Sequence, residues 1–222
     1  MLQDVSTFQR EDKYPPVIGI GASAGGLEAL EAFFSNIVQE LDFSFVVVQH
    51  LSPDYKSMMV NLLSRKTKMK VERVTDGMQL RKNCIYLIPP RKNLTVFNAA
   101  LYLNDQQDEY ELKLPINIFF KSLAAEYGNL AVGIILSGTG SDGTQGIKAI
   151  KEAGGMVMVQ EPSDAKFDGM PTSAINTNVV DYILPASELP SRLITYFQHP
   201  YIQKLNQSGM KILRRILKIT NF

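Results

Sequence analysis

The sequence predicts a doubly wound α/β fold, with a mainly parallel sheet, helices on both faces and one antiparallel hairpin. Three observations favour this class. Apolar runs of strand length alternate with segments whose apolar residues recur every three or four positions, as strands and crossover helices do. The runs at 43–48 and 132–136 are hydrophobic almost throughout, which is typical of strands covered on both faces. The chain has 222 residues, 45% hydrophobic and 20% charged, which suits one large domain rather than two.

The first half of the chain opens with a strand and a helix. Residues 17–20 are apolar, and the apolar spacing from Leu27 to Ile37 predicts the helix that follows. The buried strand at 43–48 precedes a helix at about 56–64. The other elements predicted for this half are strands at 71–74 and 84–88 and a hairpin of 94–97 with 101–103 around Asn98-Ala99-Ala100.

The second half repeats the alternation. A helix at 115–127 precedes the buried strand at 132–136, and after a glycine-rich turn a helix runs from about 143 to 153, where Gly154-Gly155 closes it. The last predicted elements are a strand at 156–159, a short helix with Pro171 in its first turn, a strand at 182–184 and a helix that ends by Phe197.

The charge distribution suggests a domain boundary. The totals of 23 basic and 22 acidic residues give a net charge of +1, so no global field favours nucleic acid. The segment 189–222, however, holds six basic residues and no acidic one. We expect a linker or disordered segment at 1–14, one domain at 15–199 and a basic amphipathic tail at 200–222. The tail is expected to open a following domain, and the alternative is a helix packed back on the sheet.

Cysteine content and the N-terminus bear on compartment and cofactors. The single cysteine, Cys84, cannot form an internal disulfide, and its place in an apolar strand predicts an inert core thiol. No Cys/His cluster has the spacing of a zinc site. The apolar runs are strand-sized and the N-terminus lacks the pattern of a signal peptide, so we expect a cytoplasmic protein with no transmembrane segment and no metal or organic cofactor.

Three chemically capable side chains follow predicted buried strands. Ser23 comes after the first strand, His50 after the second, and Asp142 after the strand at 132–136. Because ligands of a doubly wound sheet gather at the carboxyl ends of its strands, these residues are candidates for nucleophile, general base and orienting carboxylate. The only other histidine is His199, at the boundary with the basic tail, so a histidine base in the body of the domain must be His50.

Each of these residues also has a plain structural interpretation. Ser23 is suited to cap the first helix, His50 to be a structural histidine at a strand end, and Asp142 to cap the helix after it. A cap would contribute mainly to stability, whereas an orienting carboxylate would contribute mainly to turnover. The coincidence of all three at strand ends favours the catalytic interpretation.

The glycine-rich turn after the first strand fits two chemistries. The pattern Gly19-x-Gly21-x-x-Ala24 loosely matches a dinucleotide fingerprint, but the second strand ends in Gln49-His50 instead of the acidic residue that binds ribose. In a hydrolase, the same turn would expose Ser23 and offer backbone N–H groups at a helix start to an oxyanion. We therefore favour the hydrolase.

Four motifs carry a family resemblance. They are Gly-Ala-Ser23-Ala-Gly-Gly, Val-Val-Gln-His50-Leu, Leu-Ser-Gly-Thr-Gly-Ser-Asp142-Gly and Phe-Asp-Gly-Met-Pro-Thr-Ser-Ala-Ile at 167–175. In this order, and over about residues 17–197, the chain resembles the catalytic domain of bacterial chemotaxis protein-glutamate methylesterases. The resemblance implies a doubly wound sheet with Ser23 as nucleophile, His50 as base and Asp142 as orienting acid. It also implies hydrolysis of glutamate γ-methyl esters on chemoreceptors or similar helical signalling proteins, with deamidation of glutamines in related members.

The resemblance also implies the surroundings of the reacting ester and marks some departures. Ala24 and Gly25 would supply oxyanion contacts, with Thr139 and Met170 beside the ester. Stand-alone members of the family have Thr where this chain has Ala24, often Met where it has Thr139, and Pro-Ser-Val-Asp where it has Pro115-Ile116-Asn117-Ile118. These variants resemble methylesterase domains fused to a receptor methyltransferase. The rival function is a non-catalytic signalling or binding module that keeps the fold.

Overall fold

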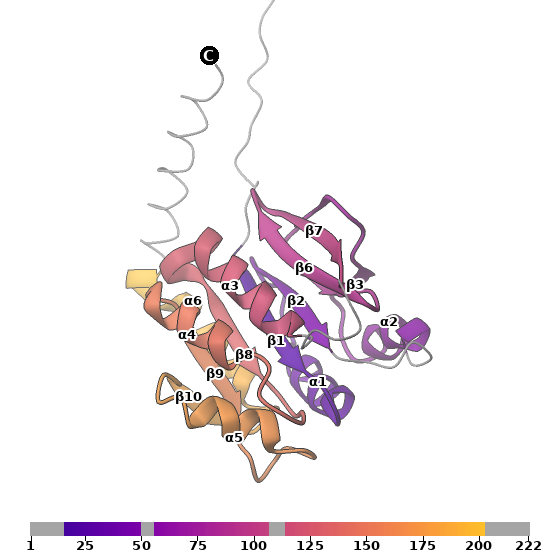
Figure 1. Ribbon diagram of the computed structural model, residues 1–222. Helices are drawn as coiled ribbons and strands as arrows, with labels where there is room; N and C mark the ends of the chain where they lie inside the picture. The colour runs from indigo at the N-terminus through magenta and orange to yellow at the C-terminus, as the bar shows by residue number, and fades with distance from the viewer. Residues whose placement is uncertain (1–15, 50–55, 107–113, 203–222) are drawn as a thin grey trace, which may run out of the picture.

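A seven-stranded parallel sheet forms the centre of the computed structural model, which describes residues 16–49, 56–106 and 114–202 (Figure 1). A second, three-stranded antiparallel sheet lies beside it. The strands are β1 (Val17–Ala22), β2 (Ser44–Gln49), β3 (Lys70–Arg73), β4 (Met78–Gln79), β5 (Cys84–Leu87), β6 (Lys92–Phe97), β7 (Ala100–Asp105), β8 (Val132–Ile135), β9 (Met156–Gln160) and β10 (Tyr182–Leu184). The helices are α1 (Gly26–Ser35), α2 (Lys56–Ser64), α3 (Pro115–Tyr127), η2 (Gly128–Leu130), α4 (Thr144–Glu152), α5 (Gly169–Ile175) and α6 (Leu189–Gln198).

The order of the strands creates one switch point. The large sheet runs β10-β9-β8-β1-β2-β5-β3, so the chain first places β2, β3 and β5 on one side of β1 and then crosses to β8 on the other. All the pairings in this sheet are parallel, and Gly21 of β1 lies opposite Ile135 of β8 and Val48 of β2. The carboxyl ends of β1 and β8 therefore flank the switch point, which is where such sheets hold ligands.

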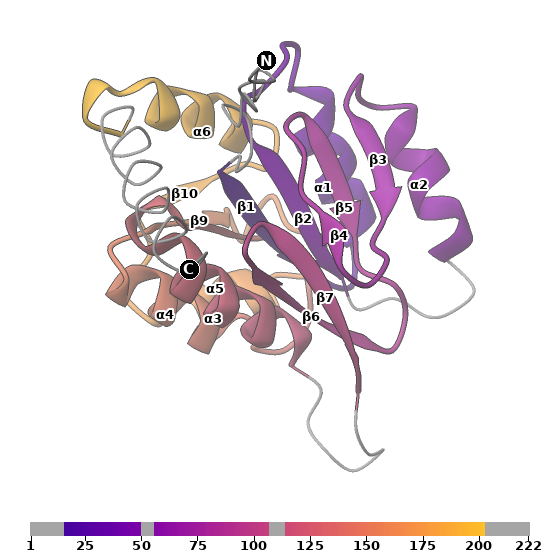
Figure 2. The same ribbon diagram turned by 90° about the horizontal axis from the view of Figure 1, so that it is seen from above.

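Helices cover both faces of the large sheet. Figure 2 shows α3, α4 and α5 on one side and α1, α2 and α6 on the other. Neighbouring residues of each strand point to opposite faces, so Ile18 and Ile20 join the cluster with α1 and α6, whereas Val17 joins the cluster with α3 and α4. This two-sided burial explains why the strands are almost uniformly hydrophobic.

Helix α3 lies directly on β1. A Cβ atom built at Gly19 would stand 2.7 Å from the Phe120 ring, and one at Gly21 would stand 2.6 Å from the Ile116 side chain. Both distances are too short for real carbon contacts, so the two glycines of β1 make room for α3. This packing explains the Gly19-x-Gly21 spacing without a dinucleotide.

The small sheet is built on a tight hairpin. Phe97 pairs with Ala100, which leaves Asn98 and Ala99 as a two-residue turn with φ of 48° and 54°. Two successive positive φ values are characteristic of the type I′ turn that matches the twist of a hairpin. Strand β6 also contacts α3, because the Val96 N–H donates to Ser122 Oγ at 3.1 Å.

The predicted fold class is confirmed. The predicted helices at 56–64 and 115–127 and the strand at 182–184 have the bounds of α2, α3 and β10. Two details of the small sheet were predicted wrongly: β7 continues beyond 103 to Asp105, and β4 was missed. Strand β4 has only two residues, too few to show a period, and it exists because it pairs with β7.

Candidate active site

Ser23 lies immediately beyond β1, at the switch point. Its backbone N–H donates to the Ser137 carbonyl at 2.9 Å, which extends the β1–β8 ladder by one bond. Helix α1 has Gly25 as its N-cap residue, in the left-handed region with φ of 69°, and no side chain caps it. The structural interpretation of Ser23 as the helix cap is therefore wrong. The half-buried hydroxyl makes no hydrogen bond within the described part of the chain, so it is available for chemistry.

Ser137 holds together the segments around this turn. Its side chain is fully buried, and its Oγ donates to the Ala24 carbonyl at 2.8 Å and accepts from the Phe167 N–H at 3.0 Å. A Cβ atom at Gly25 would stand 2.7 Å from the same oxygen. The Ser137 hydroxyl thus packs directly under the turn and joins it to the segment before α5.

Two buried glutamines end the strands on either side of the switch point. Gln49, the last residue of β2, donates from Nε2 to the Ser23 carbonyl at 3.3 Å. Gln160, the last residue of β9, accepts the Ser137 N–H at 2.8 Å and donates to Asp164 at 2.8 Å. Both side chains are more than nine-tenths buried, so their carboxamides fix the backbone of the two loops from within the fold.

Gly138 brings Ser23 and Met170 together. A Cβ atom at Gly138 would stand 2.9 Å from Ser23 Cβ and 2.2 Å from Met170 Sδ, so only glycine fits. Met170 is 1% exposed and belongs to the apolar cluster with α3 and α4, so it underlies the site and presents almost no surface. Thr139 is exposed on the loop after Gly138, and a Cβ atom built at Gly169 would stand 3.4 Å from its Cα atom.

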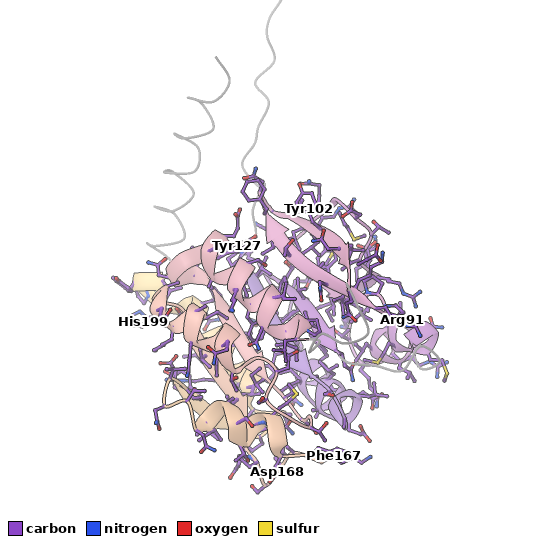
Figure 3. All side chains as sticks on the ribbon, viewed as in Figure 1. Arg91, Tyr102, Tyr127, Phe167, Asp168 and His199 are labelled. Carbon is purple, nitrogen blue, oxygen red and sulfur yellow. The ribbon has the colours of Figure 1, made fainter. Side chains whose placement is uncertain are left out.

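Charged and aromatic side chains border the turn. Lys166 Nζ lies 2.6 Å from a carboxylate oxygen of Glu28, in the first turn of α1, and this hydrogen bond holds the pKa of Glu28 below its usual range. The neighbouring Phe167 is 41% exposed, and Figure 3 shows it with Asp168 at the lower end of the molecule, below α5 and α1. A Cβ atom built at Gly25, two residues after the candidate nucleophile, would stand 3.0 Å from this ring, so the ring offers an apolar contact near the turn.

Asp142 is buried and stabilises the start of α3. Its Oδ2 accepts the Ile116 N–H at 3.0 Å, and its Oδ1 accepts the N–H groups of Asn117 at 3.0 Å and Gly143 at 2.8 Å. The N-cap residue of its own following helix, α4, is Gly143, with no side-chain cap bond. Asp142 therefore caps a helix, as its structural interpretation predicted, but that helix is α3 and not α4, the helix that follows it.

The two helices cap each other. Asp142, just before α4, accepts the first N–H groups of α3, and Asn117 of α3 accepts the Gly146 N–H of α4 through Oδ1 at 2.8 Å. Unpaired N–H groups at both helix starts are thus satisfied by the neighbouring helix. The exchange explains why an amide side chain stands at position 117, one of the positions where the sequence departs from the family pattern. It also holds the Asp142 carboxylate in one place.

His50 lies outside the described residues. The residue before it, Gln49, is paired in register with Ala22, the residue before Ser23. The tail from 203 onward and the predicted linker at 1–14 also lie outside the described part of the chain. The domain bounds and the fate of the tail remain predictions.

The described ranges hold neither a metal cluster nor a helix that could span a membrane. Within 16–49, 56–106 and 114–202, no group of three or more His, Cys, Asp or Glu residues is arranged to hold a metal ion. In the same ranges, no helix has both the length and the hydropathy needed to cross a membrane.

Solved structures identify the class of protein. The fold matches the crystal structure of the Thermotoga maritima CheB methylesterase catalytic domain with a TM-score of 0.75 and 27% identity, covering 82% of this chain and 98% of that one. The domain thus has the architecture of a methylesterase catalytic domain. The family model described as CheB methylesterase matches residues 18–193, so the chain belongs to the CheB methylesterase family, a family of hydrolases.

Two curated relatives show the range of proteins in which this domain occurs. A Paramagnetospirillum magneticum protein named protein-glutamate methylesterase/protein-glutamine glutaminase 3 is 34% identical over 80% of this chain and 50% of its own length. A 104.1 kDa protein of Rhodobacter capsulatus is 48% identical over 57% of this chain and 13% of its own length. The matched part of the chain thus spans half or less of the length of each of these two relatives. The expected fusion to a methyltransferase stays a prediction, because neither name mentions one.

Sequence reasoning missed Ser137 and Gln49 as parts of the site. Each was visible as a polar residue at the end of a hydrophobic strand, and such a residue must find a hydrogen-bond partner once it is buried. Which partner it finds depends on the neighbouring strands, and the sequence does not specify that.

Proposed function

We propose that this chain hydrolyses glutamate γ-methyl esters, with Ser23 as nucleophile, His50 as general base and Asp142 as the carboxylate that orients the base. The observation that carries the proposal is the Ser23 turn. A half-buried serine hydroxyl without a described partner follows β1 at the switch point, two residues before a helix N-terminus. Family membership adds the reaction class.

The proposed reaction has two steps. His50 takes the Ser23 proton as Oγ attacks the ester carbonyl carbon, and the carbonyl oxygen becomes an oxyanion held by backbone N–H groups of Ala24 and Gly25. The tetrahedral intermediate then expels methoxide, which takes the proton from His50 and leaves as methanol. A water molecule, deprotonated by His50, attacks the acyl-enzyme, and Ser23 leaves with that proton while glutamate is released.

The surroundings of Asp142 support its proposed role. Three backbone N–H groups hold the carboxylate, which lies at the N-terminal end of α3. A carboxylate held in one place can stabilise a cationic imidazole in one orientation. Stabilising α3 and orienting His50 are thus compatible tasks for the same group.

The proposed substrate rests on membership of the methylesterase family. We propose methylated glutamates on the helices of a cytoplasmic chemoreceptor or a similar signalling protein, with glutamine deamidation as a side activity. Relatives named protein-glutamate methylesterase/protein-glutamine glutaminase support both reactions. The exposed Phe167 is suited to contact an apolar strip of such a helix.

Methanol release tests the proposal. Methylated receptor fragments incubated with the wild-type chain should release methanol, and Ser23→Ala should release none above background. Ser141→Ala is the matched control, since this exposed serine lies on the neighbouring loop and its side chain makes no described hydrogen bond. Equal release by wild type and Ser23→Ala would refute the proposal and favour the non-catalytic module.

A further inference from the structure

We propose that Gln49 and Ser137 are positioning residues that aim the N–H groups of Ala24 and Gly25 at the oxyanion of the substrate. The inference rests on the proposed function and extends it to two side chains that touch neither substrate nor nucleophile oxygen. It follows from the hydrogen bonds of two consecutive carbonyls.

The first carbonyl belongs to Ser23. It accepts the Gly26 N–H at 2.9 Å and the Gln49 Nε2–H at 3.3 Å, so it is held from within the fold. The Gln49 carboxamide also approaches the start of α1, because a Cβ atom at Gly26 would stand 2.9 Å from Nε2. The Ser23–Ala24 peptide is therefore fixed by a side chain that is itself 7% exposed.

The second carbonyl belongs to Ala24. It accepts the Ser137 Oγ–H at 2.8 Å, the shorter of the two carbonyl contacts of that hydroxyl, since the Phe167 carbonyl lies at 3.3 Å. The Ser137 hydroxyl is fully buried, its oxygen accepts the Phe167 N–H, and the backbone N–H of the same serine is bound by Gln160. The Ser137 side chain that fixes the Ala24–Gly25 peptide is therefore itself held by Phe167 and Gln160.

Because a peptide is planar, fixing these two carbonyls also fixes the directions of the two N–H groups in the same peptides. The chain contains no cis peptide among the described residues, and in a trans peptide the N–H points opposite to the C=O. The Ser23 carbonyl thus directs the Ala24 N–H away from Gln49, and the Ala24 carbonyl directs the Gly25 N–H away from Ser137. Neither N–H has an acceptor within the described part of the chain, so both remain available to an anion.

The unfavourable burial of the Gln49 carboxamide supports a role beyond packing. Its Oε1 is buried and finds no hydrogen-bond partner in the described part of the chain, where the carboxamide makes a single bond, the one to Ser23. A buried unpaired oxygen destabilises a fold, and an apolar side chain of the same size would avoid it. The Nε2 donor is the group that distinguishes glutamine from such a residue here. Fixed donors in a buried setting stabilise developing charge without reorganisation.

The test uses two variants and a matched control. Ser137→Ala removes the donor to Ala24, and Gln49→Met removes the donor to Ser23 with little change in volume. Ser122→Ala is the control, because the Ser122 hydroxyl also bonds one backbone N–H and one carbonyl, at Val96 and Phe119, and joins only α3 to β6. The probe is a fluorophosphonate, whose phosphonyl oxygen occupies the place of the oxyanion after Ser23 displaces fluoride.

Labelling rates give the first readout. We expect Ser137→Ala and Gln49→Met to label roughly 10-fold to 100-fold more slowly than wild type, somewhat less than the loss of a whole oxyanion donor. Ser122→Ala should label at the wild-type rate. The pH at half-maximal labelling should not move in any variant, because the Ser23–His50 pair is untouched.

Amide resonances give a readout that a merely structural role would not produce. In the wild-type adduct, the Ala24 and Gly25 amide protons should shift downfield as they bind the phosphonyl oxygen. Ser137→Ala should lose the Gly25 shift and keep that of Ala24, and Gln49→Met should do the reverse. If Ser137→Ala does not fold, Gln49→Met and the Ala24 resonance decide alone.

The outcomes separate the two proposals. A wild-type chain that never labels refutes the nucleophile, and with it this inference. Labelling of Ser23 at the same rate in wild type and in folded Ser137→Ala and Gln49→Met would leave the nucleophile intact and overturn the inference. The inference is also overturned if Ser122→Ala slows labelling as much as these two variants do, since general loosening would then explain the effect.

Discussion

Replacing Asp142 by asparagine separates the two tasks of this carboxylate. Asparagine keeps one acceptor oxygen and replaces the other by a donor. If the retained oxygen serves Asn117 and Gly143, the new NH₂ group faces the Ile116 N–H across a distance of 3.0 Å. One hydrogen bond is then lost between buried groups, and the remaining two lose the charge of their acceptor.

The magnitude follows from the loss of one charge-assisted bond. Such bonds contribute about 1.5–3 kcal/mol to stability. For a domain of this size, each kcal/mol lowers the melting temperature by about 2–4 °C. We therefore expect a drop of roughly 3–12 °C in thermal denaturation. If Asp142 also orients His50, turnover should fall by a factor on the order of 10²–10⁴.

Asn117→Ala is the matched control for this experiment. It removes the acceptor of the Gly146 N–H, the other half of the exchange between α3 and α4, and leaves the three bonds of Asp142 in place. We expect a loss of about 1 kcal/mol, as for other helix caps, with turnover near that of wild type. An Asp142→Asn chain with an unchanged melting temperature would refute the capping argument. An equal turnover in the two variants would refute the orienting role.

Two further predictions concern a glycine and the cysteine. Gly25→Ala should destabilise the chain by about 1–3 kcal/mol more than Gly77→Ala. Both glycines have a positive φ, but only at Gly25 would the new Cβ atom meet another atom closely, Ser137 Oγ at 2.7 Å. Equal melting temperatures of the two variants would contradict this. Burial raises the pKa of the Cys84 thiol, so the native chain should resist alkylation at pH 8–9 and react once unfolded. Rapid alkylation of the native chain would show that the thiol is accessible.

Local sequence signals predicted the helices and strands with good accuracy where the chain carries clear stops. Helix α3 begins at Pro115 and ends at Tyr127, before the C-cap residue Gly128, and the proline and the glycine act through their own backbone preferences. The hydrophobic runs of β2 and β8 show their burial without any knowledge of neighbours. The two-residue strand β4 carries no such signal, because its only cause is pairing with β7.

The sequence by itself determined the class of fold and placed Ser23, His50 and Asp142 after strands, because alternating hydrophobic periods imply a parallel sheet whose strand ends share one edge. Only the tertiary structure decided which groups these residues meet. Asp142 caps α3 instead of the helix that follows it, and Ser137 and Gln49 bind the carbonyls of the Ser23 turn. The physical reason is that a hydrogen bond depends on position in space. Ser137 and Ala24 are 113 residues apart in the chain, and they meet only because β8 pairs with β1.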